Sequence, residues 1–423
     1  MKRIALVLAF AFLLLGIGRC EAGSITYSSG TITVVGFNES SPCTFEDIYQ
    51  ADIANGWGVV SKQGNNQYYF TCRLQIGDGS TETWLADENK AISFSGNGHD
   101  IYVQKNGHLR LGCVVNEEKR TTRNGCYLYN DANEYYYLVL CKDGGTIEIY
   151  SSLLKAKNSA SITLYGSGHK IWNSVIISSR IIGQSHIDIY RTTIQSTTYG
   201  LRFIPTYAND IIISNAWYAI NLYSISGDKT IKNLKLIDEI TSFKTYNFNG
   251  NLHAINTECK WTFSWGWNSN GKIYRQYTYN LKVVDEEGNP ISGAKVSVYN
   301  RSGCLEFEDI TDANGQIPEQ IVTRGYYDQA HGSTLVDFSP HTLVIEKEGY
   351  ETYTMQFTPT KAIDWQISLK KAGEEETEEG GIIEVKEERK GKSDIGEGLV
   401  LGFGFGIVLL AIAFFVMKGG GRE

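Results

Sequence analysis

One hexapeptide recurs in the middle of the chain, and its first copy is Ile149-Tyr150-Ser151-Ser152-Leu153-Leu154. Related hexapeptides begin at Ile171 (IWNSVI), at Ile189 (IYRTTI) and, in a degenerate form, at Ile212 (IISNAW). Their common template is isoleucine, an aromatic residue, any residue, serine or threonine, any residue, and leucine or isoleucine. The start points advance by 22, 18 and 23 residues, and repeats of this length are typical of solenoids.

The pattern inside each repeat favours strands. Apolar and polar residues alternate, and Gly, Asn and Ser separate one repeat from the next. Inward Ile and Leu side chains of one coil would pack on those of the next coil, so the stack would share one continuous core. We therefore expect an all-β fold with a parallel β-helix over residues 23–268. An antiparallel sandwich is the alternative.

A helical pattern precedes the repeats. Thr44 followed by Asp47 resembles a capping box, and the apolar residues Phe45, Ile48, Tyr49 and Ile53 would share one face of a helix, which Asp52 interrupts. Because a solenoid needs its open end covered, this segment is predicted to be an N-terminal capping helix.

The repetitive segment, over roughly residues 25–265, resembles right-handed parallel β-helix proteins of the broad pectate-lyase-like class. The resemblance rests on periodicity and brings no catalytic signature with it. The low Met content, the Ile-, Tyr- and Asn-rich repeats and a charged segment near the C-terminus look similar to archaeal surface proteins. A virion spike of an archaeal virus would have the same layout.

A second domain is indicated by separated motifs that occur in order. Strand-like segments flank the turn Asp285-Glu286-Glu287-Gly288-Asn289-Pro290; Thr311-Asp312-Ala313-Asn314-Gly315 and Lys347-Glu348-Gly349-Tyr350 follow. This order resembles the carboxypeptidase regulatory-like family, a small β-sandwich related to transthyretin. The resemblance implies a β-sandwich over residues 269–371 that acts as a spacer, adhesion unit or folding partner, without catalysis.

Both ends of the chain carry membrane signals. Residues 1–22 have the three parts of a signal peptide: a basic N-terminal region, a short apolar segment, and small residues at the cleavage site. The twenty apolar residues 398–417 would form one transmembrane helix, because at 1.5 Å each they reach ~30 Å. Lys418 follows them, so the tail 418–423 is expected in the cytoplasm, and the charged segment 372–397 is expected to be a stalk. Gly398, Gly402 and Gly406 share one helix face and favour self-association.

These signals predict a single-pass cell-surface protein with its N-terminal domain outside, or a virion envelope protein. The chain has 423 residues, 42% of them hydrophobic, and a net charge of −8. The acidic balance argues against nucleic acid as a partner. Cys113 and Cys126 flank a polar loop and are the best disulfide candidates. No cysteine pair has C-x-x-C spacing, so neither a metal site nor a cofactor is expected. Asn38 and Asn300 are glycosylation candidates.

The residues beside the inward isoleucines should point outward. This would stack Tyr150, Trp172 and Tyr190 in an aromatic column and Glu148, Lys170 and Asp188 in a charged column beside it. Exposed rings beside charged groups suit the binding of a polysaccharide or surface glycan. The alternative is a solvated face with a ladder of ion pairs.

Catalysis has one weak pair of candidates. Glu148 and Asp188 would lie two coils apart, ~9.6 Å, which is at the far edge of the ~6.5–9.5 Å range of inverting glycosidases. The sequence contains no nucleophile elbow, no H-E-x-x-H motif and no P-loop. The expected function is therefore adhesion, glycan recognition or envelope structure without catalysis. A membrane-tethered polysaccharide lyase or glycoside hydrolase is the alternative.

Overall fold

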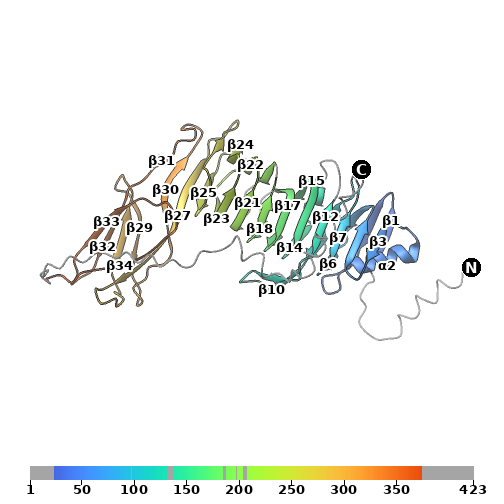
Figure 1. The fold of residues 1–423 in the computed structure, drawn as a ribbon, viewed down its shortest axis with the longest axis horizontal. Coiled ribbons are helices and arrows are strands. Elements are labelled where there is room, and N and C mark those ends of the chain that lie inside the picture. Colours follow the sequence, from blue (N-terminus) through green and yellow to red (C-terminus); the bar gives the residue numbers. More distant parts are fainter. Residues whose placement is uncertain are drawn as a thin grey trace, which may run out of the picture.

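The computed structural model describes residues 23–96, 98–130, 137–183, 187–196, 198–202 and 207–373. These residues form an elongated all-β fold with a single helix, α2 (Phe45–Asn55), at one end (Figure 1). The predicted signal peptide, membrane helix and cytoplasmic tail, and nearly all of the predicted stalk, lie outside the described residues. Within the described ranges, no helix is both long enough and apolar enough to cross a membrane.

Most strands belong to three columns of parallel strands, which we call A, B and C. The chain passes through the columns in turn, so that each circuit adds one coil to a β-helix-like stack (Figure 1). Column A contains β2 (Thr31–Val35), β5 (Arg73–Ile76), β8 (Ile101–Val103), β13 (Tyr137–Cys141), the second parts of β15 (Leu153–Leu164) and β17 (Val175–Gly183), β20 (Tyr199–Arg202), β22 (Tyr218–Tyr223), β24 (Thr241–Tyr246) and β26 (Phe263–Ser264).

Column B contains β6 (Thr83–Asp87), β9 (Gly107–Leu111), β14 (Thr146–Tyr150), β16 (His169–Trp172), β18 (Ile187–Tyr190), the first parts of β21 (Tyr207–Ser214) and β23 (Lys229–Ile237), β25 (Asn251–Ile255) and the start of β27 (Lys272–Val284). Column C contains β4 (Gln67–Phe70), β7 (Ala91–Phe94), β12 (Tyr127–Asn130), the first parts of β15 and β17, β19 (Thr193–Gln195) and the last parts of β21 and β23.

The apolar positions of the repeat build the core of the stack. Ile149, Ile171 and Ile189 pair in register across β14, β16 and β18, and all three side chains are fully buried. The prediction that they point inward is confirmed. Because each isoleucine packs on its counterpart in the next coil, the core is continuous along the stack.

The two middle positions of the hexapeptide make the turn from column B to column C. The third residue is left-handed, with φ values of 48° at Ser151 and 52° at Asn173. The fourth residue is buried, and its hydroxyl group bonds to backbone carbonyls. Ser174 Oγ, for example, donates to Trp172 O at 2.9 Å and to Ile149 O of the neighbouring coil at 3.4 Å. Hydroxyl residues at this position thus satisfy buried carbonyls in three coils, whereas the equivalent residues of the next two coils, Ile211 and Leu234, are apolar and fully buried. The degenerate copy predicted to begin at Ile212 is out of register, because Ile212 pairs with Thr193 and the residue opposite Ile189 is Ala208.

Helix α2 lies against the first coils, as predicted. Thr44 and Asp47 form the capping box, and Phe45 and Ile48 are fully buried. The predicted apolar face is wrong at Ile53, which is exposed. Asp52 is buried in its place, because its carboxylate accepts a hydrogen bond from the Val59 backbone N–H at 2.9 Å. Two antiparallel hairpins complete this end of the molecule; they pair β1 (Ser24–Ser28) with β2 and β3 (Val60–Gln63) with β4.

A second hydrophobic core lies beyond the last coil, between two sheets. One sheet is antiparallel and has the order β29 (Leu305–Ile310), β28 (Lys295–Tyr299), β32 (His341–Glu346) and β33 (Tyr353–Phe357). The facing sheet contains β27, β30 (Gln320–Tyr327), β31 (Val336–Asp337) and β34 (Ile363–Ser368). Strand β27 belongs both to column B and to this sheet, so the backbone passes from the stack into the sandwich without a linker.

Tryptophans cover the joint between the stack and the sandwich. The Trp261 ring stacks on Tyr327 at 5.3 Å between centroids, and Trp265 Nε1 donates to Gly332 O at 2.8 Å. These contacts join the last coil to the loop and strand of the sandwich that face it.

Candidate ligand-binding cleft

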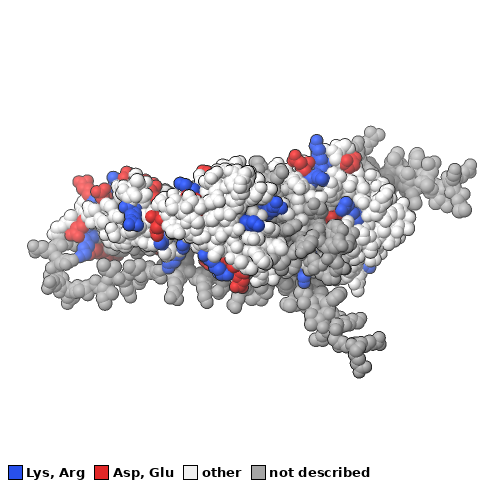
Figure 2. Space-filling model, turned by 90° about the horizontal axis from the view of Figure 1, so that it is seen from above, with Lys and Arg blue, Asp and Glu red and all other residues white. Residues whose placement is uncertain are grey.

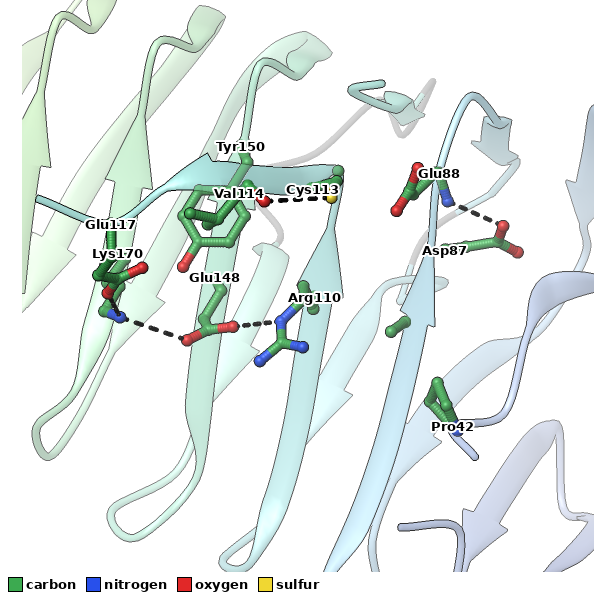
Figure 3. Close-up of a pocket in the computed structure, with 12 residues that line it drawn as sticks. Pro42, Asp87, Glu88, Arg110, Cys113, Val114, Glu117, Glu148, Tyr150 and Lys170 are labelled. Atoms are coloured by element: carbon green, nitrogen blue, oxygen red, sulfur yellow. Dashed lines mark hydrogen bonds and ion pairs between the residues drawn. The ribbon is translucent and has the colours of Figure 1, made fainter. Parts of the chain in front are cut away.

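A hairpin leaves the stack between β9 and β12 and lies across the outer face of column B. It consists of β10 (Cys113–Asn116) and β11 (Thr121–Arg123), paired antiparallel (Figures 1 and 3). Two contacts hold the hairpin against the turns that follow β14 and β16. Thr122 Oγ1 lies 2.5 Å from Ser151 Oγ, and Asn173 Nδ2 donates to Arg120 O at 2.8 Å. The hairpin is thus a cover over the coils of β14 and β16.

The predicted aromatic column exists, but most of it is not open to solvent. Tyr150, Trp172 and Tyr190 pair in register, as expected. Tyr150 is only 1% exposed and Trp172 only 2%, whereas Tyr190 is half-buried. Burial also raises the pKa of the Tyr150 phenol. The expectation of an exposed platform is wrong for these two rings, because the hairpin and Arg120 lie over them.

Two residues of the charged column, Glu148 and Lys170, belong to a continuous chain of ion pairs. Lys170 Nζ lies 2.5 Å from Glu117 of the hairpin and 3.8 Å from Glu148 (Figure 3). On its other side, Glu148 accepts from Arg110 Nε at 2.5 Å, and Arg110 also donates to Glu39 at 2.8 Å. Burial lowers the pKa of Arg110, but the hydrogen bonds to Glu39 and Glu148 outweigh this effect and the pKa is raised overall. Each cation is therefore held between two carboxylates.

These groups line a cleft of about 510 Å³ beside the hairpin (Figure 3). Three of the predicted catalytic and binding residues meet here, namely Glu148, Tyr150 and Lys170. The remaining lining comes from other coils and from the hairpin, and comprises Pro42, Ala86, Asp87, Glu88, Arg110, Gly112, Cys113, Val114 and Glu117. Four carboxylates against two cations make the cleft acidic.

Asp188 lies apart from this cleft. Its carboxylate is 3.3 Å from Arg120 of the hairpin, and burial raises its pKa, an effect that Arg120 and the Trp172 indole offset only in part. Asp188 Oδ1 and Trp172 Nε1 are buried, and neither has a hydrogen-bond partner of good geometry among the described residues. Glu148 and Asp188, the predicted catalytic pair, occupy equivalent positions of β14 and β18 with Lys170 between them. Glu148 lines the cleft beside the hairpin, whereas Asp188 does not.

The predicted disulfide is not formed, and the cysteines between residues 23 and 373 are all free. Cys113 lies at the base of the hairpin, whereas Cys126 is buried and its Sγ donates to Asp87 O at 3.3 Å. Burial raises the pKa of the Cys126 thiol to about 12. Of the glycosylation candidates, Asn300 donates from Nδ2 to Glu306 at 3.4 Å, and Asn38 Oδ1 accepts from the Ser41 backbone N–H at 2.9 Å.

Two groups of candidate site residues were not predicted from the sequence. Arg110 and Glu117 belong to the cleft, but no local pattern indicates that the loop between Cys113 and Cys126 folds back over the stack. The second group had a clear signal. Three related pentapeptides, YSISG (223–227), YNFNG (246–250) and WNSNG (267–271), recur at spacings of 23 and 21 residues.

Comparisons with known proteins assign no family. No family model matches the chain, and no curated protein matches it. Among solved structures, the chain is similar to 3-chlorocatechol 1,2-dioxygenase from Rhodococcus opacus 1CP, with 20% identity over 23% of this chain and 60% of that chain and a TM-score of 0.18. It is also similar to the TIE protein of Bacillus anthracis, with 18% identity over 26% of this chain and 20% of that chain and a TM-score of 0.18. The chain thus spans less than two thirds of either protein, and likenesses this weak support no argument about its function.

Proposed function

We propose that the chain is a secreted, C-terminally anchored surface protein that recognises a glycan without a catalytic step. In this proposal the stack is a right-handed parallel β-helix, and the sandwich is a carboxypeptidase regulatory-like spacer. Residues 1–22 direct secretion, residues 372–397 form a stalk, and residues 398–417 span the membrane of an archaeal cell or the envelope of an archaeal virus. The proposal rests on one observation, the cleft beside the hairpin with its chain of ion pairs.

Fixed charged groups in a cleft suit a ligand rich in hydroxyl groups. Arg110 is held by Glu39 and Glu148, and Lys170 by Glu117 and Glu148, so their donors and acceptors are fixed in place before a ligand arrives. Pre-organised side chains lower the entropy cost of binding. A sugar hydroxyl donates and accepts at once, and it can therefore bond to a cation and a carboxylate that lie side by side.

The same geometry favours recognition over hydrolysis. Hydrolysis with two carboxyl groups needs both of them at the same glycosidic bond. Glu148 faces the cleft, but Asp188 does not line it and is paired with Arg120. Of the predicted acid and base, the cleft therefore contains only Glu148.

Binding of the full-length chain to a glycan array tests the cleft. Lys170→Met should reduce glycan binding about tenfold, since it removes a charge-assisted hydrogen bond, and it should leave the Tm nearly unchanged. Lys155→Met is the matched control, because Lys155 is exposed on the neighbouring strand β15 and forms no ion pair with any described residue. Unchanged binding of the Lys170 variant would exclude the cleft. Release of reducing sugars or unsaturated products by the wild type would exclude a non-catalytic role.

Cell fractionation tests the anchor. Removal of residues 395–423 should release the protein into the medium, because the proposed membrane helix is lost. The full-length chain serves as the control and should stay in the membrane fraction. A truncated chain that also remains in the membrane fraction would show that the anchor is misassigned.

A further inference from the structure

Three successive coils make the same five-residue turn between column A and column B. Its copies are the pentapeptides 223–227, 246–250 and 267–271, which we call the aromatic–amide strip. They occupy equivalent places, because Tyr223 pairs with Tyr246 and the Asn247 backbone N–H donates to Trp267 O. In each copy an aromatic residue precedes a left-handed Ser or Asn, a buried residue, a second Ser or Asn, and glycine.

The aromatic residues form an exposed row along the stack. Tyr223 is 43% exposed, Tyr246 40% and Trp267 71%. The ring centroids of the two tyrosines are 5.1 Å apart, and those of Tyr246 and Trp267 are 6.2 Å apart. At the Tyr223 end of the row, the Arg202 guanidinium lies 4.6 Å from the Tyr223 ring and forms a cation–π contact with it. The Trp267 indole stands at the other end and is the most open of the three rings.

Amide groups run beside the rings. Asn268 Nδ2 donates to Asn247 Oδ1 at 2.6 Å, and Asn270 Nδ2 donates to Asn249 Oδ1 at 3.2 Å. Each carboxamide has more donors and acceptors than these bonds use. The phenol groups of Tyr223 and Tyr246 have no hydrogen-bond partner in the described part of the chain. None of the fifteen residues of the strip is charged.

We propose that the aromatic–amide strip binds a neutral glycan chain that lies along the axis of the stack. The apolar face of a sugar packs on an exposed indole such as Trp267, and the amide and phenol groups bond to its hydroxyls. The absence of charge within the strip favours a neutral glycan over a sulfated or uronate-bearing one. Successive coils are ~4.8 Å apart, close to the length of one hexose in an extended chain, so neighbouring sugars would meet equivalent side chains.

This inference depends on the proposed function only for the display of the protein outside the cell. The strip lies at the turns of the last coils and shares no residue with the cleft beside the hairpin. The large exposed surface of Trp267 also argues against a purely structural role, because an indole that is 71% exposed contributes little to folding.

Titration of the full-length chain with neutral gluco- and manno-oligosaccharides and with matched uronate oligomers tests the proposal. The wild type should bind neutral oligomers, with an affinity that rises up to about three hexoses, one for each coil at the ~4.8 Å spacing. Trp267→Ala should weaken this binding about tenfold, as expected when a sugar loses an aromatic contact. Trp217→Ala is the matched control, because Trp217 is an exposed tryptophan outside the strip, and it should bind as the wild type does.

A second variant keeps the test decisive if Trp267→Ala folds poorly. Tyr246→Phe removes only the hydroxyl group of a residue that is 40% exposed, and it should weaken binding with an unchanged Tm. The proposal is overturned if the wild type binds no neutral oligomer, if it prefers the uronate oligomers, or if the strip variants bind as well as the wild type. Failure of the cleft proposal looks different, since Lys170→Met would then leave all glycan binding intact, whereas Trp267→Ala would still weaken the binding of neutral oligomers about tenfold.

Discussion

The guanidinium carbon of Arg120, at the tip region of the hairpin, lies 4.0 Å from the ring of Tyr207 in strand β21. The same guanidinium is 5.5 Å from the Trp172 ring and 5.6 Å from the Tyr190 ring, and it pairs with Asp188 at 3.3 Å. One side chain therefore connects the hairpin to three successive strands of column B. Without it, the aromatic column would lose a large part of its cover.

Arg120→Ala is expected to loosen the hairpin. The change removes the cation–π contacts and leaves Asp188 partly buried without its partner, so the free energy of unfolding should fall by about 2 kcal/mol. Amide hydrogen exchange in β10 and β11 should accelerate more than exchange elsewhere. Arg123→Ala is the control, because Arg123 is exposed at the end of the same hairpin. Equal protection of the hairpin amides in the Arg120 variant and the wild type would contradict this function of Arg120.

Ile171 should be a critical residue of the stacked core. It is fully buried between Ile149 and Ile189. Ile171→Ala should cost about 2–5 kcal/mol of unfolding free energy, because it removes buried methyl groups and leaves a cavity. Lys170→Ala, one position away on the outer face, should cost about 1 kcal/mol or less. Denaturant unfolding measures both, and equal losses would refute the inward and outward assignment.

The ion pair of helix α2 predicts a pH-dependent stability. Hydrogen bonds from Lys62, then Tyr68 and Gln50, lower the pKa of Glu46 from 4.5 to about 2. Because the folded pKa is below the unfolded one, the carboxylate stabilises the fold above about pH 4.5, and this contribution disappears as the pH falls toward 2. Glu46→Gln should therefore lower the Tm at pH 7 but not near pH 2.

The control for this measurement is Glu118→Gln, at an exposed glutamate of the hairpin that forms no ion pair within the described ranges. It should leave the Tm unchanged at both pH values. A Glu46 variant whose Tm deficit persists at pH 2 would show that the loss comes from packing and not from the charge.

Thiol labelling tests the free cysteines. Native protein at pH 8 should react fastest at Cys304, which is exposed, while burial raises the pKa of Cys72 and Cys141 to about 12 and keeps them protonated. Denatured, unreduced protein should show every cysteine of residues 23–373 as a free thiol, seven in all. Five thiols instead of seven would indicate a disulfide, with Cys113–Cys126 as the first pair to examine by peptide mapping.

The periodic part of the fold could be predicted from the sequence because its determinants are local. Three features of the hexapeptide depend only on a residue and its counterpart in the adjacent coil. They are the inward isoleucine, the left-handed third residue and the buried hydroxyl group of the fourth residue. The capping box of Thr44 and Asp47 is more local still. The aromatic–amide strip could have been predicted in the same way, because its pentapeptide occurs three times in the sequence. It was not predicted, because the hexapeptide template covers a different part of each coil.

The state of the outer face depended on contacts between segments far apart in the sequence. Alternation places Tyr150 and Trp172 outside the coil, yet it says nothing about the hairpin that buries them. Likewise, equal spacing aligns Glu148 with Asp188, but Arg110 and Arg120 come from other segments and pair the two carboxylates separately. The sequence by itself therefore determined the coil and its inward face, because each repeat packs on an equivalent neighbour. Only the tertiary structure decided which outer side chains remain open to a ligand, because the path of an inserted loop is set by the surface on which it lands.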